Sequence, residues 1–524
     1  MLRVPLHSGS RLPLVTLPDD TVLLAAPPPL EPLADVGAAC VEALRYPLAG
    51  PSLGSVLPAG GRATVLVQAP VLPLPTVEDD PRRDALAAVL DTLAQGGIRP
   101  DAITVLVTAG LGRRPGRRDL EGLLRPDRAR DFRGRIVVHD CEADDLRAIT
   151  VGGRVLRTHP ALVDTDLVVT IGAAETALHG GPTALLDACA PGVIRAARTQ
   201  SLLEVSGSTG WRLAAQLEAR LRETTPVVGL SLVLDHPRES GLHRGYPWDP
   251  DALASVTHSP LRRILNVLPA GLRRQLLTRG RRRLDVVAAL AGPSSVAHAE
   301  ALVRGTAVRG VPVTEPFETL VVPLPWESLQ VPREPLNPIT AAALGLGYVL
   351  RLWRNAPPLV EGGTVVLLHP FSRVMGTSSQ APYRALFATL RDGAAGARLG
   401  AEEAVAARDR RALAAYANGT APHPRQPFAD WESCAHVLER AGRVIVAGCR
   451  DAAAARALGL VPSHSTATAL GMASGLAGGD ARTGVILGPP YPGLIVEQEQ
   501  VSDRSGTAAV SPGPDTPSAR RRSS

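Results

Sequence analysis

Short apolar runs rich in valine alternate with segments whose apolar residues recur at helical spacing along most of this chain. Continuous apolar runs of this length are typical of strands buried on both faces of a parallel sheet. Their alternation with helices predicts an α/β fold with largely parallel sheets. The predicted strands are residues 64–68, 103–108, 135–139, 167–171, 227–234, 286–290, 319–322, 364–368, 443–447 and 485–487. The predicted helices are residues 84–95, 211–223, 297–303, 339–354, 401–417 and 466–472.

An arginine-rich stretch interrupts this alternation and ends near Arg283. We therefore predict two α/β domains, residues 1–283 and 284–500, with a ligand cleft between them. The last segment, residues 501–524, consists mainly of Ser, Thr, Gly, Pro and Arg. Because this composition offers little to bury, we expect a disordered tail.

The arginine-rich stretch, about residues 236–283, is called the basic insertion below. Between His236 and Arg283 it holds ten arginines and three acidic residues. Its net charge therefore exceeds the net charge of +6 of the whole chain. Leucines and isoleucines recur there at helical spacing, which predicts two short amphipathic helices separated near Pro269 and Gly271. They could dock on an acidic partner or a membrane surface, or they could cover the fold with solvated arginines. The second interpretation is favoured, because such stretches are common on ordinary surfaces.

The chain contains no lysine, and all 56 of its basic residues are arginine. A guanidinium stays protonated and is a poor nucleophile, so Schiff-base chemistry, a P-loop ammonium and a covalent tether through an amine are excluded. A GC-rich genome accounts for much of this bias. Drift from lysine to arginine would nevertheless have spared any lysine that the chemistry of the protein required.

Other features of the composition narrow the class of protein. Aromatic residues make up 3% of the chain, which leaves few stacking platforms, so nucleic acid is not an expected partner. The five cysteines form no C-x-x-C pair, so neither a zinc knuckle nor a disulfide framework is predicted. Signatures of serine hydrolases, zincins and P-loop proteins are missing. With no signal peptide and no long apolar run, we expect a cytoplasmic location.

Three loops are candidates for ligand binding, because ligands of parallel sheets bind beyond the carboxyl ends of the strands. Arginines and free backbone N–H groups there would suit a small carboxylate or phosphate. An ordinary polar loop explains each of them as well. A single histidine is a poor metal site, so no metal is predicted. The candidate ligand-binding residues are Arg113, Arg114, His179, Thr183, His369 and Arg373.

An ordered series of segments resembles the nickel-pincer lactate racemase family from about Arg3 to about Val496. The segments include LPDDTVLLAAPPPLEPLADVGAACVEALRYPLAGPSL, LAQGGIRPDAITVLVTAGLGRR, DTDLVVTIGAAE, VVAALAGPSSVAHAEAL and LGLVPSHSTATALGMA. The resemblance implies two α/β domains. It also implies racemisation or epimerisation of 2-hydroxy acids by hydride transfer to a pyridinium-derived nucleotide that carries nickel and is tethered to a lysine.

The positions that the resemblance assigns to this chemistry carry other residues here. The tethering lysine falls near Asp187, and one metal histidine falls near Leu178, next to His179. Residues 193–211 contain no histidine where the second metal ligand is expected. Nickel requires imidazole or soft ligands, so a tethered nickel nucleotide is not expected in this chain. The other family positions fall on Ala69, Leu72, Gly112, Thr340 and Ala343.

Three hypotheses follow. The first is a lactate-racemase-like protein that has lost the tethered nickel chemistry and binds a small anionic ligand or nucleotide in the interdomain cleft. The second is an active isomerase with an untethered cofactor, which would need no lysine. The third is a scaffold or regulatory protein that docks through its basic insertion.

Overall fold

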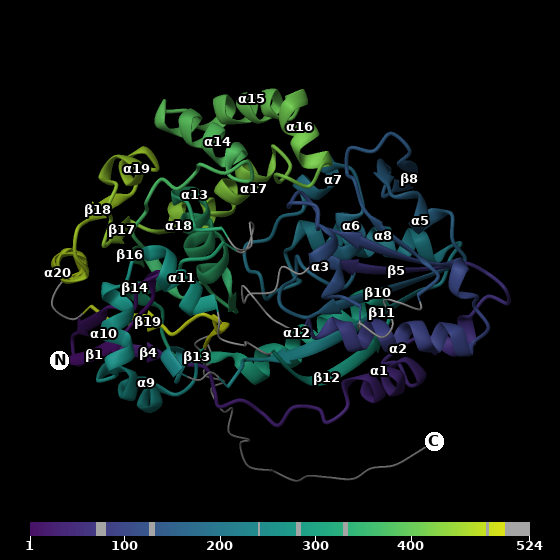
Figure 1. Cartoon of the computed structure of the whole chain (residues 1–524), viewed down its shortest axis with the longest axis horizontal. Helices are drawn as coiled ribbons and strands as arrows, with labels where there is room; N and C mark the ends of the chain where they lie inside the picture. Colours follow the sequence, from purple (N-terminus) through teal and green to yellow (C-terminus); the bar gives the residue numbers. More distant parts are fainter. Residues whose placement is uncertain are drawn as a thin grey trace, which may run out of the picture.

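The computed structural model describes residues 1–69, 80–124, 132–238, 241–278, 284–328, 334–477 and 481–497. The predicted tail, residues 501–524, lies outside the described residues, as do residues 239–240 and 279–283 of the basic insertion. Two mainly parallel sheets form the two lobes of the molecule, at the right and the left of Figure 1, and this confirms the predicted fold class.

The first sheet has the strand order β12-β11-β10-β5-β6-β7. β12 runs antiparallel to β11, and the other neighbours are parallel. Successive residues of β5 face two different cores, because Val65 and Val67 pack against the α1 and α2 side while Leu66 packs against the α6 and α8 side. The strands are β5 (Ala63–Gln68), β6 (Ile103–Thr108), β7 (Arg135–Val138), β10 (Leu167–Ala173), β11 (Val227–Asp235) and β12 (Asp285–Gly292).

Helices cover both faces of the first sheet (Figure 1). A separate antiparallel pair, β8 (Arg147–Val151) and β9 (Arg154–Thr158), lies in the same lobe. The helices are α1 (Val36–Arg45), α2 (Arg82–Gln95), α3 (Arg117–Glu121), α5 (Pro160–Val163), α6 (Thr183–Asp187), α7 (Pro191–Ala196), α8 (Thr209–Arg222) and α12 (Ser294–Arg309), with short 3-10 turns η1 (Leu53–Val56) and η2 (Pro100–Ala102).

The second sheet has the order β18-β17-β16-β14-β19-β4, with parallel neighbours, and β2 extends it by pairing with β14. Its strands are β2 (Ser8–Gly9), β4 (Val22–Leu24), β14 (Phe317–Pro325), β16 (Leu359–Leu368), β17 (Arg443–Ala447), β18 (Val461–Ser463) and β19 (Thr483–Ile486). Two smaller sheets accompany it, formed by β1 (Leu2–Pro5) with β3 (Leu14–Leu17), and by β13 (Val311–Val313), β20 (Leu494–Val496) and β15 (Trp353–Arg354).

The second lobe also has helices on both faces of its sheet. The basic insertion forms α9 (Pro250–Thr257), α10 (Pro260–Val267) and α11 (Ala270–Thr278), after the short turn η3 (Gly241–His243). Leu253, Val256 and Leu265 of these helices are buried against one face of the second sheet. The remaining helices are α13 (Pro338–Ala342), α14 (Ala381–Arg391), α15 (Gly396–Ala406), α16 (Arg410–Ala417), α17 (Gln426–Ser433), α18 (Ala435–Arg440), α19 (Ala452–Ala457) and α20 (Thr466–Ala477).

The two sheets do not follow the predicted ranges 1–283 and 284–500. β12 comes after Arg283, yet it pairs with β11 and completes the first sheet. Conversely, β2 and β4 from the start of the chain join the second sheet. No helix among the described residues combines the length and the apolar content that are needed to cross a membrane.

Two predicted helices are shorter than expected. Residues 339–354 form α13, a π-helical turn η4 (Ala343–Tyr348) and a 3-10 turn η5 (Val349–Arg351), after which Trp353 pairs with β20. Gly347 allows this turn to pack on α17, because a Cβ there would lie 1.9 Å from the Ser433 hydroxyl oxygen. Residues 401–417 are divided because α15 ends at Ala406 and Asp409 caps α16 by accepting from two backbone N–H groups.

Residues 193–205 connect the two lobes. Arg195 pairs with Glu403 at 2.9 Å and with Glu432, and Arg198 pairs with Glu432 at 2.6 Å. Arg351 of the second lobe, 5% exposed, donates to the carbonyls of Thr199 and Gln200. The segment therefore fixes one lobe against the other.

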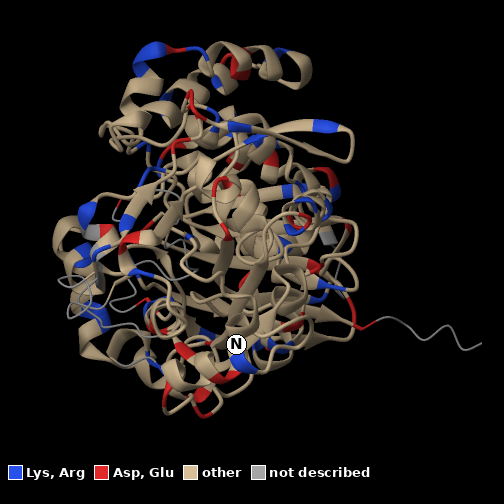
Figure 2. Ribbon diagram, turned by 90° about the vertical axis from the view of Figure 1, so that its right-hand side faces the viewer, with Lys and Arg blue, Asp and Glu red and all other residues tan. Residues whose placement is uncertain are grey.

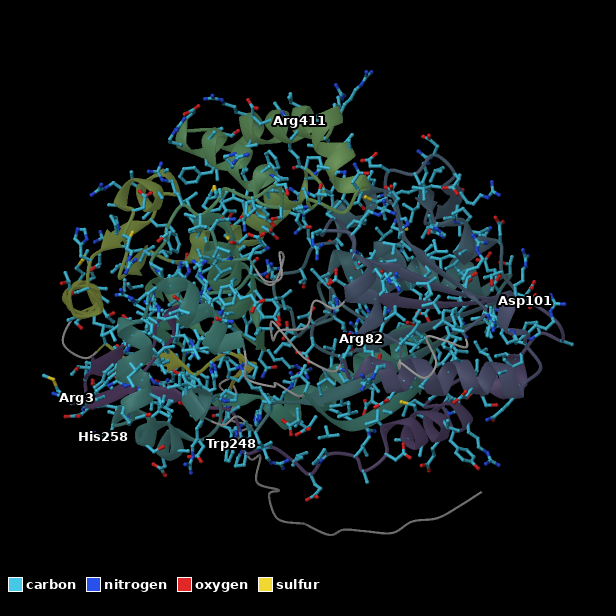
Figure 3. All side chains as sticks on the ribbon, viewed as in Figure 1. Arg3, Arg82, Asp101, Trp248, His258 and Arg411 are labelled. Atoms are coloured by element: carbon cyan, nitrogen blue, oxygen red, sulfur yellow. The ribbon has the colours of Figure 1, made fainter. Side chains whose placement is uncertain are left out.

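We predict that Arg351→Leu destabilises the protein by about 2–4 kcal/mol, because it leaves buried carbonyl groups without a donor. The melting temperature measured by differential scanning fluorimetry should fall by several degrees. Arg411→Leu is the control, because Arg411 is exposed on α16 (Figure 3). Equal melting temperatures for the two variants would contradict this role of Arg351.

Candidate functional site

The order of the first sheet creates a switch point between β5 and β10. From β5 the chain proceeds through β6 and β7 on one side, and from β10 it proceeds to β11 on the other. Connections that leave in opposite directions open a crevice at the carboxyl ends of these two strands, where ligands of such sheets bind. The residues that follow Gln68 and Ala173 are therefore the candidate site.

Gln68 organises the polar groups at this switch point. It is 2% exposed and is the last residue of β5. Its side-chain amide donates to the Asp187 carboxyl group at 2.5 Å and accepts from the Gly180 N–H at 2.5 Å. The amide thus joins the end of α6 to the loop after β10, and both of its polar ends are engaged.

Arg82 supports Gln68 from the start of α2. Its guanidinium donates to the Gln68 carbonyl at 2.8 Å and to both carboxylate oxygens of Asp80, at 3.0 and 2.6 Å. Arg82 is fully buried, and Figure 3 shows it on the side of the first lobe that faces the second. Because Asp80 neutralises it, Arg82 adds little net positive charge to the site.

Asp187 is held in an environment that favours its neutral form. One carboxyl oxygen lies against Gln68, and the other lies 3.0 Å from where a Cβ of Gly110 would be. Removal from water raises the pKa of Asp187 to about 7, and the hydrogen bond from Gln68 opposes this rise. Near neutral pH a substantial share of this carboxyl group is therefore protonated.

His179 lies in the same region without a polar partner. Both ring nitrogens are shielded from water and have no hydrogen-bond partner among the described residues. Burial, followed by the nearby charges of Arg82 and His298, lowers the pKa of His179 to about 3. The ring is neutral at physiological pH, so it offers one donor and one acceptor but no charge.

Gly180 and Gly181 are needed because His298 packs directly on them. Both have positive φ, +98° and +54°, and a Cβ on either would lie 2.3 Å from an atom of His298. His298 is fully buried, donates from Nε2 to the Thr176 carbonyl at 3.1 Å and accepts from the Ser231 hydroxyl at 3.1 Å. Burial lowers the pKa of His298 to about 4, so it is a neutral packing residue.

The other predicted residues of the first lobe have structural partners. Thr183 is buried and donates to the Gly180 carbonyl at 2.7 Å, so its hydroxyl is engaged within the loop. Arg113 pairs with Asp119 at 3.1 Å. Arg114 contacts Asp140 at 3.2 Å and donates to the Ala417 carbonyl of the second lobe at 2.6 Å, which makes it an interdomain link.

The two predicted residues of the second lobe lie elsewhere. His369 lines a cavity of about 510 Å³ at the carboxyl ends of β14 and β16. Arg373 forms an ion pair with Asp451 and lines a neighbouring hollow. His179 and Thr183 thus belong to one loop of the first lobe, and none of the first-lobe candidates lines the cavity of His369.

Sequence reasoning named Asp187 only as a family position and did not select Gln68 or Arg82. A polar residue at the last position of a buried strand was the available signal for Gln68. Arg82 carried no distinctive signal, because its hydrogen bond to the Gln68 carbonyl forms only once β5 and α2 are packed.

Comparison with known sequences finds a family match over the first part of the chain. The family described as lactate racemase N-terminal domain matches residues 9–192. Residues 9–192 are therefore similar to this family. The match includes β5, β10, Gln68 and Asp187. No curated protein has a matching sequence.

Solved structures extend the likeness of fold beyond these residues. The structure of the lactate racemase apoprotein from Thermoanaerobacterium thermosaccharolyticum is 15% identical, with a TM-score of 0.60, and covers 95% of this chain and 100% of that one. A crystal structure of a protein from Thermotoga maritima is 11% identical, with a TM-score of 0.47, and covers 90% of this chain and 100% of that one. The lactate racemase apoprotein thus shares the two-lobed fold.

The tethered nickel nucleotide that the family resemblance implies does not fit these residues. Asp187, at the position expected for the tethering lysine, is a carboxyl group that Gln68 already engages. Within the described ranges no three His, Cys, Asp or Glu side chains gather as a metal site. His179 alone cannot supply the imidazole ligands that nickel requires.

We predict that Asp187→Asn changes the pH dependence of stability. The folded carboxyl titrates near pH 7 and the unfolded one near its ordinary value of 3.8, so the folded state binds the proton more tightly. The unfolding free energy of the wild type should therefore fall as pH rises from about 4 to about 7. The variant has no carboxyl group at this position and does not lose stability in this way. The melting temperature of the variant minus that of the wild type should therefore be several degrees higher at pH 8 than at pH 5.

The exposed Asp101→Asn variant is the control for this measurement (Figure 3). Its difference from the wild type should be the same at both pH values. A pH-independent difference for Asp187→Asn as well would show that Asp187 is ionised in the folded protein throughout this range.

Proposed function

We propose that this lactate-racemase-like protein has lost the tethered nickel chemistry and binds a small anionic ligand or nucleotide non-covalently between its two lobes. The observation that carries the proposal is the hydrogen bond between Asp187 and Gln68, at the position where the resemblance places a lysine. A carboxyl group in that place cannot form the tether, and the chain has no lysine side chain elsewhere that could replace it.

The polar groups that remain at the switch point suit binding rather than proton abstraction. Asp187 is engaged by Gln68, and the low pKa of His179 leaves a weak base that carries no charge. A general base has to combine reach to the substrate with a pKa near the working pH. His179 and the partly protonated Asp187 can instead donate and accept hydrogen bonds. Recognition of the charge would fall to arginines, which bind carboxylate and phosphate through two parallel hydrogen bonds.

A docking function of the basic insertion is the second candidate. Leu261, Ile264 and Val267 of α10 are 59%, 52% and 82% exposed, and Leu272 and Leu276 of α11 are 49% and 44% exposed. Such apolar side chains beside arginines resemble the face of a helix that rests on an acidic partner or an anionic membrane surface.

The proposal predicts a chain free of covalent cofactor. Protein purified from nickel-supplemented cells should contain far less than one nickel per chain by inductively coupled plasma mass spectrometry. Its denatured mass should equal that of the sequence, because no side chain can hold the nucleotide. An authentic lactate racemase prepared in parallel is the positive control.

Two results would contradict the proposal. Stoichiometric nickel together with a pyridinium nucleotide would show that the family chemistry is retained. Racemisation of a 2-hydroxy acid by protein with an unmodified mass would support the isomerase with an untethered cofactor.

A further inference from the structure

A second polar site lies in the second lobe, apart from the switch point of the first sheet. A cavity of about 510 Å³ opens at the carboxyl ends of β14, β16 and β17, beside the first residues of α20. This volume is within the range of small-molecule sites in proteins. Its polar lining combines residues from the start, the middle and the end of the chain, among them Ser10, Arg11, Arg273, His369, Arg450 and Ser465.

The charge of this cavity is one-sided. Four arginines line it, and no aspartate or glutamate is among its described lining residues. Over the rest of the molecule arginines and acidic residues are interspersed (Figure 2), and several arginines form ion pairs. Arg11, Arg273 and Arg450 form no ion pair with the described residues. These three arginines therefore lack the acidic partners that several arginines have elsewhere in the protein.

Arg273 is the most informative of the four, because it is 6% exposed. Its guanidinium donates to the Ser10 hydroxyl at 3.1 Å and to the Leu268 carbonyl, and both acceptors are neutral. Burial, followed by the nearby charges of Arg11, Arg450 and Arg274, lowers the pKa of Arg273. A buried cation surrounded by other cations is costly, and an anion in the cavity would relieve the cost.

Neutral donors complete the lining. His369 accepts from the Phe371 N–H through Nδ1 at 3.1 Å, so in the neutral ring the proton is on Nε2, which becomes a donor. Burial lowers the pKa of His369 to about 3, which keeps the ring neutral. The amino-terminal end of α20, a helix of 12 residues, adds the positive end of its dipole beside Ser465.

We propose that this cavity binds a phosphate-bearing small molecule, whose phosphate group is held by Arg11, Arg273 and Arg450. A phosphate monoester carries nearly two negative charges and presents three acceptor oxygens, which match several guanidinium groups and hydroxyl donors at once. The proposal deepens the anionic-ligand part of the proposed function and does not depend on the loss of nickel. The same phosphate group could belong to a free metabolite or to a lipid head group, since the exposed leucines of α11 lie on the helix that carries Arg273.

Titration calorimetry with inorganic phosphate, glycerol 3-phosphate and AMP tests the proposal on the full chain. At least one of the two organic phosphates should bind more tightly than inorganic phosphate, and glycerol and adenosine should not bind. Arg11→Gln with Arg450→Gln should weaken binding about tenfold or more, because both guanidinium groups would contact the phosphate. Both side chains are exposed, so the double variant should fold normally, and unchanged melting would verify this.

Arg411→Gln is the matched control, because it removes one exposed arginine of α16 (Figure 3), a helix that contributes no residue to the cavity lining. Raised salt should weaken binding of the phosphates to the wild type, as expected for exposed cations.

An experiment with lipid vesicles distinguishes the source of the phosphate. If the wild type sediments with phosphatidylcholine vesicles that contain phosphatidic acid and the double variant does not, the phosphate belongs to a lipid head group. If the wild type binds only the soluble phosphates, the ligand is a free small molecule.

The proposal is overturned if the wild type binds none of these phosphates or vesicles, or if the double variant binds them as well as the wild type does. Either outcome leaves the nickel and mass measurements unaffected. Conversely, bound nickel with a tethered nucleotide would refute the proposed loss of cofactor and would leave the phosphate cavity standing.

Discussion

The structure depends on the docking of residues 193–205 of the first lobe against the second lobe. Leu202 donates its N–H to the Arg351 carbonyl at 2.8 Å, and Leu202 and Leu203 enter the core of the second lobe. The Arg195 pairs with Glu403 and Glu432 are only about 15% exposed on the arginine side. Buried ion pairs of this kind add little net stability, because desolvation offsets their attraction. They do select one orientation, and so they specify how the two lobes face each other.

This docking also explains the sequence of the segment. The resemblance expects a metal histidine between residues 193 and 211, and the structure uses Arg195, Arg198 and Ser201 there to contact the second lobe. These three side chains are engaged across the interface, and none of them is a histidine that could bind a metal. The departure from the family pattern at Asp187 therefore has a counterpart on the neighbouring segment.

The strands could be predicted from the sequence because parallel strands buried on both faces are continuous apolar runs, as in residues 103–108 and 443–447. The pairing of β12 with β11 and of β2 with β14 could not, since it depends on contacts between residues far apart in the chain. The same limit applies to the site. The sequence indicated strand-end loops as candidate sites, and in the structure Arg113 and Arg373 of these loops pair with Asp119 and Asp451. Conversely, Arg11, Arg273 and Arg450 meet only after folding.

The charged groups at the carboxyl ends of the two sheets are arranged in opposite ways. On the first sheet Asp80 neutralises Arg82, Gln68 engages Asp187, and removal from water lowers the pKa of His179, so the cluster is close to neutral without any ligand. On the second sheet Arg11, Arg273 and Arg450 line one cavity, and the buried Arg273 donates to the neutral Ser10 hydroxyl. A neutral cluster gains little from binding an ion, whereas a buried cation without an acidic partner gains from it directly. Electrostatic attraction therefore favours an anion at the second sheet, whereas a ligand at the switch point of the first sheet would be held mainly by hydrogen bonds to neutral groups.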